Sequence, residues 1–149
     1  MIHIRRNRVT YLLTPTGIAE MAKMSRDSLQ YSLRFYSDAR QRVGARFAKL
    51  STEWPADSGD KRIVFFGTGE VAEIGYVCLQ ETDLQLVGVI DDQGRSRFFD
   101  VPLHRPEWLR EVNGSAPFGR LVVMSFKDAD RIARELAELG VRPDGICWL

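Results

Sequence analysis

A glycine turn between a predicted strand and a predicted helix constrains the fold of this chain more than any other feature. The turn has the form G-x-G-x-x-A and reads Gly67-Thr68-Gly69-Glu70-Val71-Ala72. The run before it, residues 62–66, is continuously apolar after Arg62, as in a strand that is buried on both faces. Residues 70–81 then place apolar side chains on one side of a helix. This order predicts the first unit of a parallel α/β sheet.

The same alternation continues to the last residue. Residues 84–90 and 120–124 predict two further strands, and a short extended run (101–103) and a helical turn (106–109) lie between them. Residues 127–139 predict an amphipathic helix that ends at Gly140, and residues 145–149 predict a final strand. Alternation of this kind requires right-handed crossovers. We therefore predict an α/β fold with a Rossmann-like parallel sheet of about four to five strands.

The glycine turn has the chemistry of an anion site. Gly67 permits the tight turn, Gly69 lets the backbone approach a phosphate, and the helix N-terminus offers N–H groups to an anion. Asp91 and Asp92 end the second strand, where a carboxylate can accept hydrogen bonds from ribose hydroxyls. Residues just after the third strand are expected at the same crevice, because ligands bind beyond the carboxyl ends of parallel strands. The candidate ligand-binding residues are Gly67, Thr68, Gly69, Glu70, Val71, Asp91, Asp92, Ser125, Phe126 and Lys127.

Each of these interpretations has an alternative. Glu70 and Glu73 put two acids in the first helical turn, where they can satisfy the helix dipole and repel a pyrophosphate. The turn can therefore be a compact connection without a ligand. In the same way, Ser125 and Lys127 can be an ordinary helix cap and helix start.

The sequence assigns no catalytic residue and no metal site. None of the tyrosines has a lysine four residues later, and His104 stands alone in a predicted loop, where a solvated role is expected. The two histidines and two cysteines have no metal-ligand spacing, and both Cys78 and Cys147 lie in apolar segments as expected for core thiols. A binding module is therefore favoured over an enzyme.

Residues 1–50 predict a separate module. Two strand-like runs flank the polar tip Arg6-Asn7-Arg8, and Thr14-Pro15 is typical of a helix start. From residue 29 a heptad-like apolar seam continues to residue 50, interrupted by Arg40, and a lone helix cannot bury such a seam. The seam consists of Leu29, Leu33, Tyr36, Val43, Phe47 and Leu50. We expect a homodimer through residues 29–50, with packing inside the chain as the alternative.

Charge divides the chain in the same place. Residues 1–50 carry ten Lys and Arg against three acids, and residues 51–149 carry eleven against seventeen. Such asymmetry suggests a basic module joined to an acidic one, with residues 51–60 as a polar linker and residues 61–149 as the second domain. The N-terminus lacks the apolar run of a signal peptide, and no stretch approaches the length of a membrane span. We expect a cytoplasmic protein with no membrane partner.

The segment Tyr11-Leu12-Leu13-Thr14-Pro15-Thr16-Gly17-Ile18-Ala19-Glu20 resembles the end of the wing and the following helix of MarR-type winged-helix regulators, especially those associated with exopolysaccharide gene clusters. The resemblance covers residues 2–50. It implies a DNA-binding wing around Arg5, Arg6 and Arg8 and a dimerisation helix after it. Winged-helix proteins place the recognition helix before the wing, so the DNA-reading half is expected upstream of Met1 or has been lost.

Residues 62–149 are similar to the nucleotide-binding domain of CapD-type polysaccharide-biosynthesis proteins, which are nucleotide-sugar epimerases and dehydratases. The similarity rests on Phe66-Gly67-Thr68-Gly69-Glu70, on Val87-Gly88-Val89-Ile90-Asp91-Asp92 and on Val101-Pro102-Leu103. It implies an NAD(P)-like or nucleotide-sugar ligand and brings no catalytic residues. The order of a winged helix and a Rossmann domain also resembles redox-sensing repressors of the Rex type.

Together these patterns favour a ligand-sensing regulatory protein. It would join a partial winged-helix module to a Rossmann-like domain, in regulation of polysaccharide synthesis. Two alternatives remain open at this stage: an epimerase or oxidoreductase subunit that acts on nucleotide sugars, and a non-catalytic interaction protein with a vestigial pocket.

Overall fold

The computed structural model describes residues 26–95, 97–112 and 115–149. The predicted basic hairpin with Arg5, Arg6 and Arg8 and the predicted helix start at Thr14-Pro15 lie outside the described residues.

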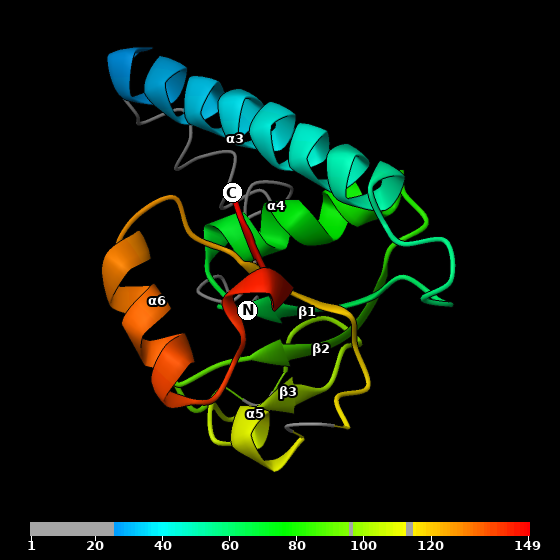
Figure 1. The fold of residues 1–149 in the computed structure, drawn as a ribbon. Helices are drawn as coiled ribbons and strands as arrows, with labels where there is room; N and C mark the ends of the chain where they lie inside the picture. The colour runs from blue at the N-terminus through cyan, green and yellow to red at the C-terminus, as the bar shows by residue number, and fades with distance from the viewer. Residues whose placement is uncertain (1–25, 96, 113–114) are drawn as a thin grey trace. The chain divides into compact units, whose positions relative to one another are not determined.

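After one long helix the described elements alternate between strands and helices, except that β3 follows β2 directly (Figure 1). The helices are α3 (Arg26–Thr52), α4 (Glu70–Leu79), α5 (Trp108–Glu111) and α6 (Ala129–Glu138), with a 3-10 turn, η2 (Pro143–Gly145). The strands are β1 (Arg62–Phe66), β2 (Gln85–Ile90), β3 (Leu103–His104), β4 (Arg120–Val123) and β5 (Ile146–Trp148). The predicted elements of residues 62–149 are therefore found within a few residues of their expected bounds.

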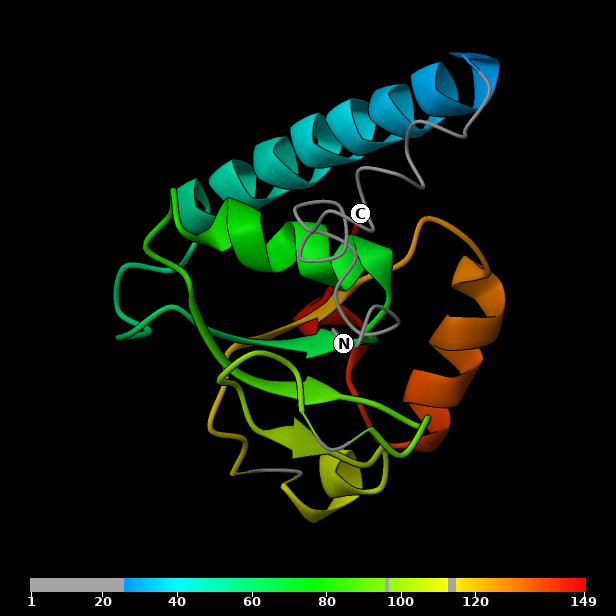
Figure 2. The same ribbon diagram turned by 180° about the vertical axis from the view of Figure 1, so that it is seen from behind.

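The five strands form one parallel sheet in the order β3-β2-β1-β4-β5. The chain starts in the middle of this sheet with β1, builds outward to β3, and then returns across β1 to build outward again through β4 and β5. The arrowheads of β1, β2 and β3 all point to the side from which the chain enters α4 (Figures 1 and 2). The predicted Rossmann-like α/β fold is confirmed, and the strand order reverses between β1 and β4.

The sheet separates two apolar layers. On one face, the C-terminal part of α3 and all of α4 pack over alternate residues of β1, such as Ile63 and Phe65. On the other face, α5 and α6 pack over Val64 and over Leu121 and Val123 of β4. Strand residues are therefore buried on both faces, which explains why β1 is a continuous apolar run and not an alternating one.

The C-terminal half of α3 belongs to the core of the α/β body. Ala39, Val43, Phe47 and Leu50 are buried, and the Phe47 ring stacks on Phe65 with 6.0 Å between ring centroids. This half of the predicted heptad seam is thus used inside the chain. Burial of a phenylalanine of this size stabilises the fold by about 1.5–3 kcal/mol.

The chain forms two compact units, Met1–Asp38 and Ala39–Leu149, and the division falls inside α3. The sequence suggested a division at residues 51–60. In the structure Trp54, from that segment, is buried, and its ring lies where a Cβ on Gly119 would approach to 2.6 Å. Residues 51–60 are therefore tied to the α/β body at least through Trp54.

Within the described parts of the chain, no helix combines the length and the apolar character that crossing a lipid bilayer requires.

Candidate functional site

The glycine turn lies in the middle of the sheet, at the carboxyl end of β1. Gly67 has φ of 119°, a conformation that side chains disfavour, and its N–H donates to the Ile90 carbonyl at 2.9 Å. On its other side the Met124 N–H donates to the Phe66 carbonyl at 3.1 Å. The turn is thus held between the ends of β2 and β4, beside the point where the strand order reverses.

Gly69 is the N-cap residue of α4, and no side-chain hydrogen bond caps the helix at this residue. Its φ of −76° and ψ of −163° are open to any residue, and within the part of the chain that the structure describes a Cβ added to it would meet no atom within 4 Å. The first backbone bond of α4 runs from the Glu73 N–H to the Gly69 carbonyl at 3.1 Å. The first turn of a helix leaves backbone N–H groups without helical partners, so this end of α4 can receive an acceptor.

Two acids stand in the first turn of α4. Glu70 is exposed and Glu73 is half-buried, and neither residue is without an interaction partner. Their carboxylates interact favourably with the helix dipole, and the same charges oppose an anionic ligand.

The carboxylate of Asp91, which the sequence assigns to ribose hydroxyls, contacts the glycine turn and is engaged by donors of the chain itself. Oδ1 accepts from the Thr68 hydroxyl at 3.2 Å and from the Gln93 N–H at 3.0 Å, and Oδ2 accepts from the Arg95 N–H at 3.1 Å. Both Asp91 and Thr68 are buried. The carboxylate therefore fixes the loop after β2 against the turn after β1.

Arg95 contacts the glycine turn, a contact that sequence reasoning missed. Its guanidinium Nη1 donates to the Thr68 carbonyl at 3.0 Å, so the side chain crosses from the loop after β2 to the glycine turn. The sequence signal that could have indicated this contact is a glycine and an arginine shortly after the acid pair, in Asp91-Asp92-Gln93-Gly94-Arg95. In the structure Gly94 has a φ of 71°, and the loop turns back there.

Asp92 points elsewhere. It is exposed, and its carboxylate accepts from the side-chain amide of Gln93 at 3.0 Å. It therefore does not share in the network that Asp91 makes with the glycine turn.

The residues after β4 form a local turn on the other side of β1. The Ser125 hydroxyl donates to the Lys127 carbonyl at 3.0 Å and accepts from the Lys127 N–H at 3.1 Å, so it is used within the turn. The Lys127 side chain is exposed, and the Phe126 ring lies 4.5 Å from the Arg42 guanidinium carbon. Asp128, which precedes α6, has a left-handed φ of 60°. Left-handed backbone at a non-glycine residue is a form of local strain that clusters at ligand sites.

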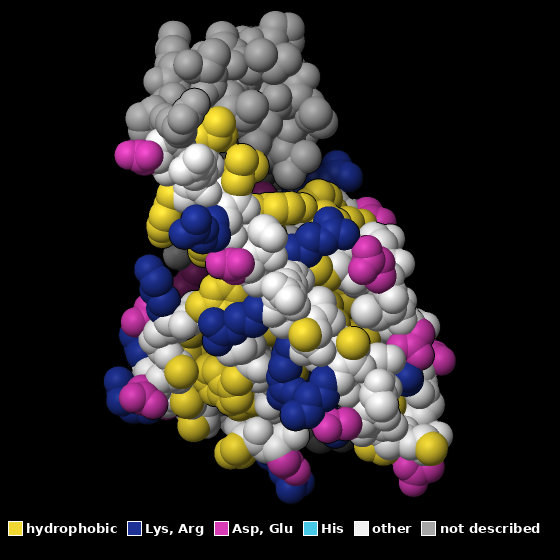
Figure 3. Space-filling view, turned by 90° about the horizontal axis from the view of Figure 1, so that it is seen from above, with side chains coloured by type: hydrophobic (Ala, Val, Ile, Leu, Met, Phe, Trp, Pro, Cys, Tyr) yellow, Lys and Arg dark blue, Asp and Glu magenta, His cyan; other side chains and the backbone are white. Residues whose placement is uncertain are grey.

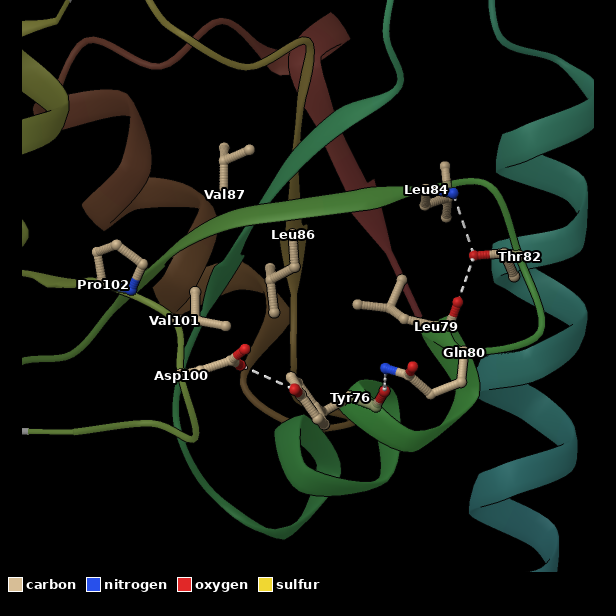
Figure 4. Close-up of a pocket in the computed structure, with 10 residues that line it drawn as sticks. All are labelled: Tyr76, Leu79, Gln80, Thr82, Leu84, Leu86, Val87, Asp100, Val101 and Pro102. Atoms are coloured by element: carbon tan, nitrogen blue, oxygen red, sulfur yellow. Dashed lines mark hydrogen bonds between the residues drawn. The ribbon is translucent and has the colours of Figure 1, made fainter.

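A separate cleft of about 600 Å³ lies beside the amino-terminal half of β2. Figure 4 shows the Tyr76 and Asp100 side chains pointing toward each other, and the Tyr76 hydroxyl donates to Asp100 Oδ1 at 2.8 Å. The Gln80 amide donates to the Tyr76 carbonyl at 3.4 Å, and the Thr82 hydroxyl donates to the Leu79 carbonyl at 3.0 Å. These polar groups of the cleft are satisfied within the chain, and the cleft lies at the end of β2 opposite to Asp91.

His104 lies in β3, and the expectation of a solvated loop residue was wrong. Its ring stacks on Trp108 with 3.9 Å between centroids, and partial burial lowers its pKa. The reason is Trp108 at the start of α5, whose ring covers one face of the imidazole and partly shields it from water. This environment favours the neutral imidazole.

Both cysteines are free and buried, which confirms the expectation of core thiols. Burial is the main cause that raises the pKa of the Cys78 thiol and of the Cys147 thiol. In the described ranges there is no group of three or more His, Cys, Asp or Glu side chains that could hold a metal ion.

Comparisons with protein-family models, with curated proteins and with solved structures find no significant match to this chain.

Proposed function

We propose that this chain is a cytoplasmic ligand-sensing regulatory protein that binds a nucleotide or a nucleotide sugar, with NAD(P) among the candidates, at the glycine turn. The ligand would lie over Gly67–Val71, with the loops after β2 and β4 on either side. No residue is assigned a catalytic role in this proposal.

The observation that carries the proposal is the open space in front of Gly69. The backbone there requires no glycine, since its φ is ordinary and a Cβ would meet no atom of the described residues within 4 Å. By contrast, Gly67 is required by its positive φ. A glycine that the fold does not need, at a helix N-terminus whose N-cap residue makes no side-chain hydrogen bond, is typical of close approach by a phosphate.

The position in the sheet supports the same assignment. Phe66 of β1 pairs with Ile90 of β2 and with Val123 of β4, so the turn that follows lies between the loops of two neighbouring strands. In open α/β sheets such a place, next to a reversal in strand order, is where ligands bind.

Dimerisation through α3 is part of the proposal. The C-terminal half of the predicted seam is buried within the chain, so the interface would use the N-terminal half of the helix. There Leu33 is 61% exposed and Tyr36 is 41% exposed. Figure 3 shows a face of the molecule where hydrophobic side chains and Lys or Arg side chains lie beside one another.

The regulatory role rests on the resemblance of residues 2–50 to a winged-helix module. In this proposal Arg5, Arg6 and Arg8 contact DNA phosphates, and ligand binding in the α/β body changes how two copies present these arginines. The resemblance also suggests polysaccharide synthesis as the regulated process.

A second candidate is a non-catalytic interaction protein whose glycine turn holds no ligand. The engaged carboxylate of Asp91 favours it, because three donors of the chain itself take the place that ribose hydroxyls would take.

A thermal-shift panel separates the two candidates. The full chain is heated with NAD, NADP, a UDP-sugar or coenzyme A at a concentration well above the expected Kd. A ligand at about a hundred times its Kd stabilises the folded chain by about 2.7 kcal/mol, so a rise of several degrees in Tm is expected. No shift with any of these ligands would exclude the sensor and leave the interaction protein.

A further inference from the structure

The outer edge of β2 is open over most of its length. Among the described residues, β2 pairs with β3 only at Val89 and Ile90, whereas residues 85–88 have a strand neighbour on one side alone, which is β1. The main-chain groups of a strand point alternately toward its two neighbours. The groups of residues 85–88 that point away from β1 are therefore not used by the sheet, and they can bond to an added strand.

Val87 forms a bulge in this open segment. The register of β1 with β2 moves from Ile63↔Leu86 to Val64↔Gly88, so that Val87 has no register partner in β1. A bulge bends an edge strand and interrupts its ladder. It therefore limits an added strand to a few residues, and it disfavours the long edge-to-edge pairing of two sheets.

The cleft beside this edge can hold an apolar side chain. Its volume is about 600 Å³, and its lining comes from α4, from β2 and from the residues just before β3 (Figure 4). Tyr76, Leu86 and Val101, one from each of these segments, are all half-buried, so part of their apolar surface is in contact with water. A side chain that fills the cleft removes this surface from water, which favours binding.

The cleft also carries a negative charge. Among the described residues that line it, Asp100 is the one charged side chain, and it is exposed. Its Oδ1 accepts from the Tyr76 hydroxyl at 2.8 Å, which fixes the carboxylate at the mouth of the cleft. A carboxylate has room for several donors, so a cation of a partner can add to this bond.

The opposite edge of the sheet is closed by the chain itself. Arg46 of α3 donates to the Trp148 carbonyl at 2.8 Å, at the end of β5, and Arg42 donates to the Leu149 carbonyl at 3.0 Å. These side chains take backbone acceptors that an added strand would need. In the described sheet, the open backbone therefore lies on the side of β2.

A second copy of the chain does not suit this edge. In a symmetric pair each copy offers the same surface, so the Val87 bulge would meet itself and the two Asp100 carboxylates would approach each other across one seam. Leu86 and Val87 are half-buried in their own body and cannot enter a partner's cleft. A separate segment with a free apolar side chain is under neither constraint.

We propose that the outer edge of β2 is a peptide-binding site, which takes a short extended segment of another protein as an added strand. The main chain of this segment bonds to residues 85–88, an apolar side chain enters the cleft, and a neighbouring Lys or Arg lies at Asp100. The site is at the end of β2 opposite to Asp91, so the inference does not depend on a ligand at the glycine turn.

The test begins by selecting binders of the full chain from a phage library of random short peptides. The enriched consensus is synthesised with a fluorescent label, and its Kd is measured by fluorescence polarisation. The same peptide is also made with N-methyl groups on alternate backbone nitrogens, which remove the donors of an added strand. Amide resonances of the isotope-labelled chain locate the bound peptide.

The protein variant is Asp100→Asn, which keeps an acceptor for the Tyr76 hydroxyl and removes the charge. Asp144→Asn is the matched control, because Asp144 is also an exposed aspartate with one side-chain partner, Arg142, but lies in η2 beside β5. Urea denaturation of both variants verifies that the fold is retained.

We expect a consensus in which an apolar residue lies next to Lys or Arg, with the largest amide shifts at residues 85–87. N-methylation on the nitrogens that face β2 weakens binding by about tenfold, the size of one lost hydrogen bond. Asp100→Asn weakens binding by about twofold to fivefold, as for an exposed ion pair, and Asp144→Asn leaves it unchanged. The inference is wrong if no peptide is enriched, if the consensus is acidic, if the shifts lie away from residues 85–87, or if neither N-methylation nor Asp100→Asn lowers the affinity.

Discussion

Replacing each glycine of the turn by alanine is predicted to have opposite effects: Gly67→Ala lowers the stability of the fold, and Gly69→Ala lowers the affinity for the ligand. Gly67→Ala puts a side chain at φ of 119°, and its Cβ would lie 3.7 Å from the Met124 carbonyl oxygen. Backbone strain of this kind costs about 1–3 kcal/mol, so we expect the free energy of unfolding to fall by that amount. Gly69→Ala places its Cβ in open space at an ordinary φ, so we expect a stability change within about 1 kcal/mol.

For ligand affinity we expect the larger loss in Gly69→Ala and the smaller loss in Gly67→Ala. The methyl group of Gly69→Ala occupies the space through which a phosphate approaches the first turn of α4, and we expect affinity to fall by about tenfold or more, or about 1.4 kcal/mol. The Gly67→Ala variant, measured below its unfolding transition, keeps the open space before Gly69 and should lose less affinity.

Urea denaturation gives the unfolding free energies, and isothermal titration with NADP gives the affinities. Gly145→Ala is the control, since an added Cβ there would also meet no described residue within 4 Å, and Gly145 lies in η2, away from the turn. If Gly69→Ala binds NADP like the wild type, the space before Gly69 is not a ligand path. If it unfolds as easily as Gly67→Ala, the assignment of backbone roles within the turn is wrong.

Three further predictions concern stability. Phe47→Ala removes a fully buried ring that stacks on Phe65 and should cost about 3–5 kcal/mol in urea denaturation; a cost below about 1 kcal/mol would mean that α3 does not pack on the sheet. Gly44→Ala in the interior of α3, where a Cβ meets nothing within 4 Å, should stabilise the chain by about 0.5–1 kcal/mol, and a loss of stability would show hidden contacts there. Burial raises the pKa of Cys78 and Cys147 above the ordinary 9.0, so the folded state holds these protons more tightly than the unfolded state. Stability from this source is present below pH 9.0 and is lost as pH rises through the folded pKa values; a chain with both cysteines changed to alanine should lose less stability over that rise.

Much of the α/β body could be predicted from the sequence, because the period of its apolar residues is local information. Buried parallel strands such as residues 62–66 are continuous apolar runs, and the amphipathic helix of residues 129–138 repeats at helical spacing. The glycine turn was found in the same way, since its context of strand and helix is readable along the chain.

The packing of α3 could not be predicted, because a heptad-like seam indicates a buried stripe without naming what covers it. Val43, Phe47 and Leu50 are covered by the sheet of the same chain, whereas Leu33 and Tyr36 are exposed. The seam therefore joins two different environments within one helix.

The hydrogen-bond partners of the Asp91 carboxylate could not be predicted from the sequence either. Its position at the end of β2 was predicted, but the choice between a ligand and the donors of Thr68, Gln93 and Arg95 depends on the path of a loop. Loop conformation follows from such hydrogen bonds and from glycine φ values, and no periodicity records it.

The most direct test of the central claim is to titrate the isotope-labelled full chain with NADP and follow the backbone amide resonances by NMR. The account predicts that the largest shifts fall on the amides of residues 68–72 and of Arg95, with little change at Leu86 and Val101 in the separate cleft. Shifts that gather at the cleft and leave residues 68–72 unmoved would contradict it.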